Sequence, residues 1–196
     1  MSGEAFSTAT AKTVDVTGDP YEDFPDDQGQ DLKGAEYFKI ASDLKDFGNK
    51  AFKAGELETG IEKYRKGLRY LDEYPEADKS DPKELDGQMK HLRFTLHNNS
   101  ALLANKCKRY AEAEKWAGFA IDAAPPDAKD VDKAKAYHRR GIARIALKDE
   151  DSAKDDLQMA AKLAPGDSAI AKDLAAVKKS IQEKDKKLRA AYSKAF

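Results

Sequence analysis

Five polar side chains in this sequence have the types and the spacing needed to hold a carboxylate. Lys45 and Asn49 are four residues apart, and so are Lys135 and Arg139, which puts each pair on one face of a helix. Asn99 lies between the two pairs in the sequence. Lysine and arginine form charge-assisted hydrogen bonds with carboxylates, arginine in a bidentate way, and asparagine donates to a carboxylate while its oxygen accepts a peptide N–H. A free C-terminus carries one more carboxylate than an internal acidic residue, so these five residues predict a cradle for a chain end.

An internal repeat predicts which elements position these side chains. Units of about 34 residues that begin at residues 41, 94 and 134 carry a small residue at the same three places. These small residues are Gly48, Gly60 and Gly67 in the first unit, Ala101, Ala113 and Ala120 in the second, and Gly141, Ala153 and Ala160 in the third. Two antiparallel helices approach closely where side chains are small. Larger residues are expected to fill the space between the helices, in the pairs Phe52 and Tyr64, Leu102 and Trp116, and Ile145 and Leu157.

The resulting fold class is all-α. The apolar spacing predicts helices at residues 36–53, 57–72, 82–106, 110–123, 130–148, 150–163 and 168–194, and no segment has the pattern of a strand. Such helix pairs are typical of tetratricopeptide (TPR) repeats, here three repeats in a right-handed superhelix followed by a long C-terminal capping helix. The first helix of each unit lines the concave face of such a stack, which places all five polar residues in one groove.

The predicted organisation has three parts. Residues 1–30 contain seven acidic residues and one basic residue and read as a flexible acidic leader or linker. Residues 31–166 form the three units, at about 41–74, 94–127 and 134–167, with insertions at 75–82 and 125–132. Ser80 or Asp81 is expected to cap the third helix, with Pro82 in its first position.

The capping helix is expected at residues 168–196. Asp167 or Ser168 is expected to be its N-cap residue. Its apolar stripe is expected to cover the open end of the stack, and consists of Ile170, Leu174, Val177, Ile181, Leu188 and Tyr192. Residues 167–196 contain eight basic and four acidic residues, which makes this segment a candidate surface for an acidic partner or an anionic lipid. Its last part, residues 184–196, is basic and amphipathic, a pattern typical of helices that bind calmodulin or other acidic partner surfaces. The alternative is a helix end that is simply solvated.

Composition argues against several classes of function. The 35 basic and 36 acidic residues give no basic excess, so no nucleic-acid partner is expected. No apolar segment approaches the length of a membrane span, and the single cysteine, Cys107, suits a reducing compartment, so we expect a cytoplasmic or nuclear protein. His91, His97 and His138 lack ligand partners at metal-binding spacing, so we expect no metal, no cofactor and no catalytic residue in this chain.

Three segments resemble the first helices of carboxylate-clamp TPR domains: DLKDFGNKAFKAG, NNSALLANK and KAYHRRGIARIAL. The resemblance implies binding of the terminal EEVD of heat-shock protein 90 or 70 by Lys45, Asn49, Asn99, Lys135 and Arg139. GDPYEDFPDD, EKYRKGLRYLDE and KDKKLRAAYSKAF resemble the TPR-containing cyclophilins of the forty-kilodalton type, especially fungal ones. In that family an N-terminal prolyl isomerase domain precedes the TPR domain, and the residues before the linker here are too few for its β-barrel.

Three hypotheses follow from these observations. The first is a co-chaperone adaptor that binds the EEVD or MEEVD tail of heat-shock protein 90, or of heat-shock protein 70. The second is a fragment of a peptidyl-prolyl isomerase whose activity needs the full-length protein, so that this chain by itself is not an enzyme. The third is a general TPR scaffold whose groove binds something other than a chaperone tail.

Overall fold

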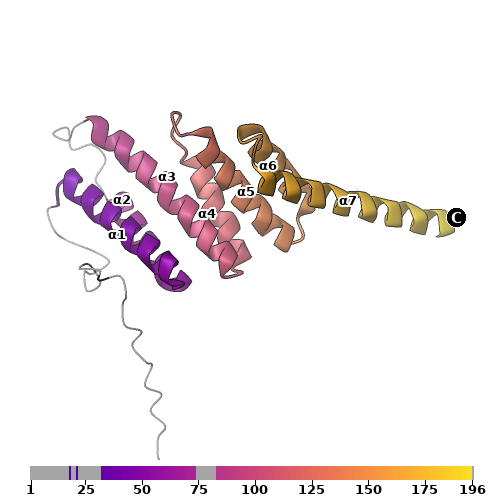
Figure 1. Ribbon diagram of the computed structural model, residues 1–196, viewed down its shortest axis with the longest axis horizontal. Helices are drawn as coiled ribbons and strands as arrows, with labels where there is room; N and C mark the ends of the chain where they lie inside the picture. The colour runs from indigo at the N-terminus through magenta and orange to yellow at the C-terminus, as the bar shows by residue number, and fades with distance from the viewer. Residues whose placement is uncertain (1–17, 19–20, 22–31, 74–82, 196) are drawn as a thin grey trace, which may run out of the picture.

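The structure, a computed structural model, describes residues 18, 21, 32–73 and 83–195, and these form seven α-helices (Figure 1). Their bounds are α1 Gly34–Ala54, α2 Leu57–Glu73, α3 Lys83–Lys106, α4 Tyr110–Asp122, α5 Asp130–Ala146, α6 Glu150–Leu163 and α7 Ser168–Ala195. All seven predicted helices are confirmed, and no strand occurs in the described part of the chain.

Some predictions lie outside the described residues. These are the acidic leader, apart from Gly18 and Tyr21, and the Ser80–Pro82 cap of the third helix. The exact limits of the three units stay a prediction.

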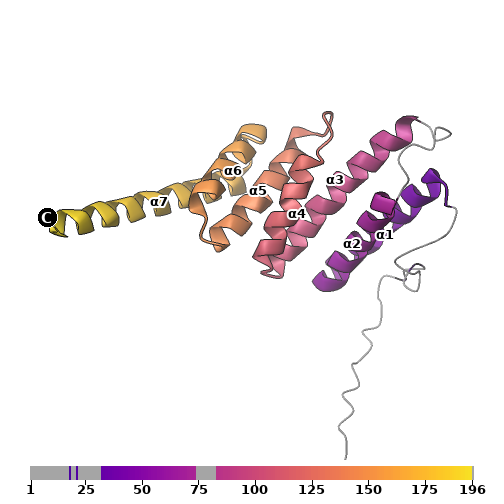
Figure 2. The ribbon, with the colours of Figure 1, turned by 180° about the vertical axis from the view of Figure 1, so that it is seen from behind.

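The helices form a row of antiparallel hairpins (Figures 1 and 2). The hairpins are α1 with α2, α3 with α4, and α5 with α6, and each packs against the next through α2 with α3 and α4 with α5. The first helices of the hairpins also meet, α1 with α3 and α3 with α5. This arrangement puts α1, α3 and α5 along one side of the stack, as expected for TPR units.

Small residues allow the helices within each hairpin to approach closely, as predicted. A Cβ atom at Gly48 would lie 2.4 Å from the Tyr64 ring, and one at Gly141 would lie 3.0 Å from Leu157. The alanines of the second unit, such as Ala113, have no exposed surface. Tyr64 and Leu157 are buried as predicted, and Leu102 is half-buried and lines a surface hollow.

Buried ion pairs hold α5 in place beside α6. Asp156 of α6 is 4% exposed and accepts hydrogen bonds from Arg140 (2.7 and 2.9 Å) and Arg144 (2.9 Å) of α5. Arg144 also donates to Glu114 of α4 at 2.9 Å. Ion pairs between a buried carboxylate and two charged partners are costly to break. These bonds therefore fix the position of α5, the helix that carries Lys135 and Arg139.

Helix α7 caps the stack over only part of its length. Asp167 caps it, because its carboxylate accepts from the N–H groups of Ala169 (2.9 Å) and Ile170 (3.2 Å), as predicted. Ile170 and Val177 are buried against α5 and α6.

The prediction that the whole apolar stripe covers the stack is wrong for its last two residues. Leu188 and Tyr192 are 57% and 62% exposed. The reason is length: α7 has 28 residues and α6 has 14, so at about 1.5 Å per residue α7 extends well past its neighbour (Figure 1). None of the described helices combines the length and the apolar character needed to cross a membrane.

Candidate functional site

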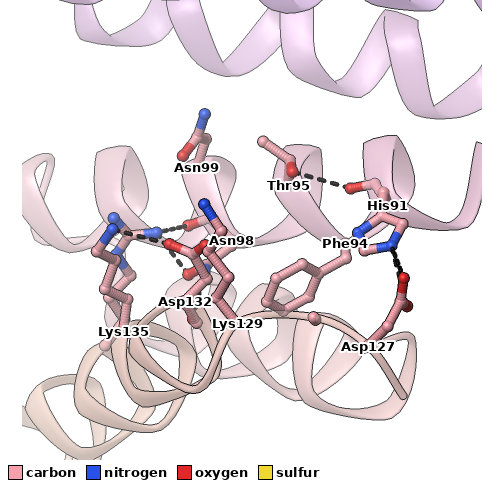
Figure 3. Close-up of a pocket in the computed structure, with 11 residues that line it drawn as sticks. His91, Phe94, Thr95, Asn98, Asn99, Asp127, Lys129, Asp132 and Lys135 are labelled. Atoms are coloured by element: carbon pink, nitrogen blue, oxygen red, sulfur yellow. Dashed lines mark hydrogen bonds and ion pairs between the residues drawn. The ribbon is translucent and has the colours of Figure 1, made fainter. Parts of the chain in front are cut away.

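The five predicted residues lie on the three adjacent first helices. Lys45 and Asn49 are on α1, Asn99 is on α3, and Lys135 and Arg139 are on α5. Asn99, Lys135 and Arg139 line a hollow of about 330 Å³ between α3 and α5, and Figure 3 shows its walls. Lys45 and Asn49 are not among the residues that line this hollow; they lie on α1, which packs against α3.

A second hollow adjoins the first. Lys135 and Arg139 also line a space of about 430 Å³ further along α3 and α5, together with Leu102, Asn105, Lys106, His138 and Ile142. The two cations therefore stand between two hollows. The first hollow is more polar, whereas Leu102 and Ile142 give the second an apolar wall.

Arg139 is the most firmly held cation of the site. Its guanidinium donates to the backbone oxygen of Asn98 at 2.7 Å and also to the Asn98 side-chain oxygen. Burial lowers the pKa of Arg139 to about 10, against the opposing effects of Tyr64 and Asp132, so the group still carries its charge at neutral pH. A cation that is partly withdrawn from water and already oriented loses little freedom when it binds an anion.

Asn98 is a residue that the sequence reasoning missed. Its side chain is 4% exposed, and its amide nitrogen donates to the backbone oxygen of Asp132 at 3.2 Å. Seven residues further on, Asn105 donates in the same way to the backbone oxygen of Arg139 at 2.8 Å. Both bonds join α3 to α5 across 34 residues, so two asparagines seven apart on a first helix are a usable signal for such a pair.

The two lysines of the site have acidic neighbours. The ammonium of Lys135 lies 2.9 Å from a carboxylate oxygen of Asp132, and that of Lys45 lies 3.4 Å from Asp46. Lys135 is 52% exposed and Lys45 is 26% exposed. Ion pairs at this level of exposure contribute about 0–1 kcal/mol, so an incoming carboxylate can replace them at small cost.

Asn49 is oriented by a tyrosine behind it. The hydroxyl of Tyr64, on α2, donates to the side-chain oxygen of Asn49 at 2.8 Å. The amide N–H groups of Asn49 are therefore left to bind an acceptor.

The three histidines have separate structural partners. His91 lines the first hollow and lies 3.0 Å from a carboxylate oxygen of Asp127, and His138 borders the second and lies 2.8 Å from Asp173. His97 stacks on Trp116, with ring centroids 5.6 Å apart, and its burial lowers its pKa to about 4. The described residues contain no group of histidine, cysteine and acidic side chains that could hold a metal ion.

Comparison with known proteins gives relatives at the levels of sequence and fold. A peptidyl-prolyl cis-trans isomerase D of Cryptococcus neoformans is 35% identical over 183 residues, which cover 91% of this chain and 49% of that protein. Its counterpart in Mycosarcoma maydis is 34% identical over 212 residues, covering 100% of this chain and 53% of that protein. The chain therefore spans about half the length of these relatives. No protein-family profile matches the sequence.

Among solved structures, the C-terminal TPR-containing domain of a Plasmodium falciparum FK506-binding protein superposes with a TM-score of 0.68. It is 26% identical, and the match covers 80% of this chain and 97% of that domain. The described part of the chain has the TPR fold. Its sequence relatives carry the name peptidyl-prolyl isomerase D, as the resemblance predicted.

Two further structures similar to this TPR domain contain bound peptides. The first TPR domain of Spaghetti (RPAP3), bound to the HSP90 peptide SRMEEVD, is 27% identical with a TM-score of 0.56, covering 74% of this chain and 94% of that one. The second TPR domain of human RPAP3, in complex with the HSP70 peptide SGPTIEEVD, is 30% identical with a TM-score of 0.55, covering 72% and 98%.

Proposed function

We propose that this TPR domain is a co-chaperone adaptor that binds the C-terminal EEVD tail of heat-shock protein 90 or 70. Lys45, Asn49, Asn99, Lys135 and Arg139 would act together as the carboxylate clamp. Such an adaptor would act in the cytoplasm or nucleus. It does not include the isomerase activity that the relatives' name states, because the chain spans about half of their length.

The main support for the proposal is the position and charge of Arg139. The guanidinium of Arg139 is charged, partly buried and held by Asn98 at the junction of two hollows, with Lys135 beside it. A fixed cation of this kind suits an anionic ligand that is itself extended along the groove. The two similar TPR domains that hold EEVD peptides support the choice of ligand.

The chemistry divides between the terminal carboxylate and acidic side chains of the peptide. Lys45, Asn49 and Asn99, on α1 and α3, would donate to the terminal carboxylate. Lys135 and Arg139, on α5, would donate to acidic side chains of the peptide. Because both sets are charge-driven, binding weakens as the salt concentration rises.

The decisive experiment compares free-acid and amidated SRMEEVD by isothermal titration calorimetry. Amidation removes the terminal charge and should weaken binding strongly, whereas equal affinities would rule out a clamp for the chain end. Lys135→Ala and Arg139→Ala should each cost about 1.5–3 kcal/mol, the range for a hydrogen bond to a charged group.

Lys178→Ala is the matched control, because Lys178 is an exposed lysine of α7 away from both hollows. Circular dichroism on each variant checks that the helices are intact. If both clamp variants bind as well as the control, the domain is a scaffold of another kind. Parallel titrations with SGPTIEEVD determine which of the two tails is preferred.

A further inference from the structure

The hydroxyl of Tyr64 binds one asparagine of the proposed clamp. Tyr64 is 1% exposed, and its ring fills the space that the missing side chain of Gly48 leaves open. Its O–H donates to the side-chain oxygen of Asn49 at 2.8 Å. One buried phenol on α2 therefore holds the side chain of Asn49 on α1.

The phenol of Tyr64 is protonated at neutral pH. Burial raises the pKa of Tyr64 to about 12, and the charge of Arg139 and the side chain of Asn99 act in the opposite direction. The hydroxyl therefore keeps its proton and acts as the donor to Asn49.

This bond joins α2 to α1. A hydrogen bond is electrostatically stronger in a site of low dielectric than in water. The bond also settles which way the amide of Asn49 faces, a choice that an asparagine otherwise makes by rotating.

We propose that Tyr64 is a positioning residue that orients Asn49 so that it presents its N–H groups to a peptide's terminal carboxylate. This inference rests on the proposed clamp. With its oxygen engaged by Tyr64, Asn49 keeps both N–H groups for the ligand. Without the hydroxyl, Asn49 is free to turn its oxygen toward the carboxylate, where the two acceptors repel each other.

The test is Tyr64→Phe, which keeps the ring against Gly48 and removes only the oxygen. We expect affinity for free-acid SRMEEVD to fall about tenfold, as for the loss of one well-placed hydrogen bond. Affinity for the amidated peptide should not change, because that peptide lacks the carboxylate that Asn49 would receive. Tyr70→Phe is the matched control, since Tyr70 is a second buried tyrosine of α2 and packs instead against Tyr37.

A double-mutant cycle separates positioning from a general structural effect. If Tyr64 acts through Asn49, then Tyr64→Phe has little further effect in an Asn49→Ala background. Additive losses, equal losses for both peptides, or unchanged binding of the free acid by Tyr64→Phe would each overturn the positioning role. If the wild type does not distinguish the two peptides, the clamp itself fails, which is a different result.

A measurement on the wild type covers the case in which Tyr64→Phe does not fold. In nuclear magnetic resonance spectra, the ring protons of Tyr64 should show Overhauser contacts to the side chain of Asn49. The side-chain amide protons of Asn49 should shift when free-acid peptide is added and stay in place with the amidated one. Absence of the contact between Tyr64 and Asn49, or equal shifts with both peptides, would overturn the inference.

Discussion

The side chains of the site differ in how firmly the protein holds them. Arg139 and Asn49 have partners that orient them, Asn98 and Tyr64, whereas Lys135 and Lys45 lie beside exposed acidic neighbours. A held group loses little entropy on binding, and a loosely paired one loses more but can adjust to the ligand. In the proposed clamp, Arg139 and Asn49 would therefore set the direction of the hydrogen bonds, and the lysines would add charge.

At the residue scale, Gly48 permits this arrangement. Gly48→Ala would place a methyl group 2.4 Å from the Tyr64 ring, and we expect overpacking to reduce the free energy of unfolding by about 1–3 kcal/mol. Gly118→Ala is the control, because no other atom lies within 4 Å of its new Cβ, and an alanine in a helix is favoured by up to about 1 kcal/mol. Urea denaturation measures both. An unchanged free energy of unfolding in Gly48→Ala would contradict the close approach of α1 and α2 at this position.

At the scale of elements, the contact between α3 and α4 includes a buried histidine. His97 of α3 lies between Trp116 and Phe119 of α4, with ring centroids 5.6 and 5.4 Å away. Burial lowers its pKa from 6.5 to about 4, with a smaller effect from the charge of Arg93. The folded protein therefore keeps His97 neutral in a pH range in which His97 of the unfolded chain takes up a proton.

The sign of the resulting pH dependence follows from linkage. Between about pH 6.5 and 4 the unfolded state binds more protons at His97, so the stability from this residue is complete above pH 6.5 and is lost as the pH falls. Between pH 7.5 and 4.5 the loss should be about 2–3 kcal/mol. His97→Gln should show a correspondingly smaller drop in unfolding free energy, measured by urea denaturation at both pH values. An equal drop in both proteins would contradict a neutral buried His97.

At the scale of the whole molecule, α7 has two parts with different roles. Its first half closes the stack with Ile170 and Val177, and Lys184 makes an ion pair with Glu150 of α6 at 2.8 Å. Beyond Lys184, the described side chains up to Ser193 are exposed. The basic, exposed second half remains a candidate surface for an acidic partner.

Truncation separates the two parts of α7. Removal of residues 185–196 should change the free energy of unfolding by no more than about 0.5 kcal/mol, because it exposes no buried surface. Ile170→Ala, the comparison variant, should cost about 2–5 kcal/mol because Ile170 is 2% exposed. Thermal and urea unfolding measure both. A truncation as costly as Ile170→Ala would mean that the second half of α7 contributes to the core.

The sequence by itself determined the helices and the repeat. Small residues at three places in each unit predict close helix pairs for a local steric reason, and Asp167 predicts the start of α7 from the chemistry of one helix end. The placing of Lys45, Asn49, Asn99, Lys135 and Arg139 on three adjacent first helices also follows from this periodicity. Their role in binding is still a proposal.

Only the tertiary structure decided which groups support these five and where the stack ends. The bonds of Asn98 to Arg139 and of Tyr64 to Asn49 join different helices, so they depend on how the helices pack and not on the pattern within either one. The exposure of Leu188 and Tyr192 has the same origin. An apolar stripe shows which face of a helix can be buried, but the length of the neighbouring helix sets how far that burial extends.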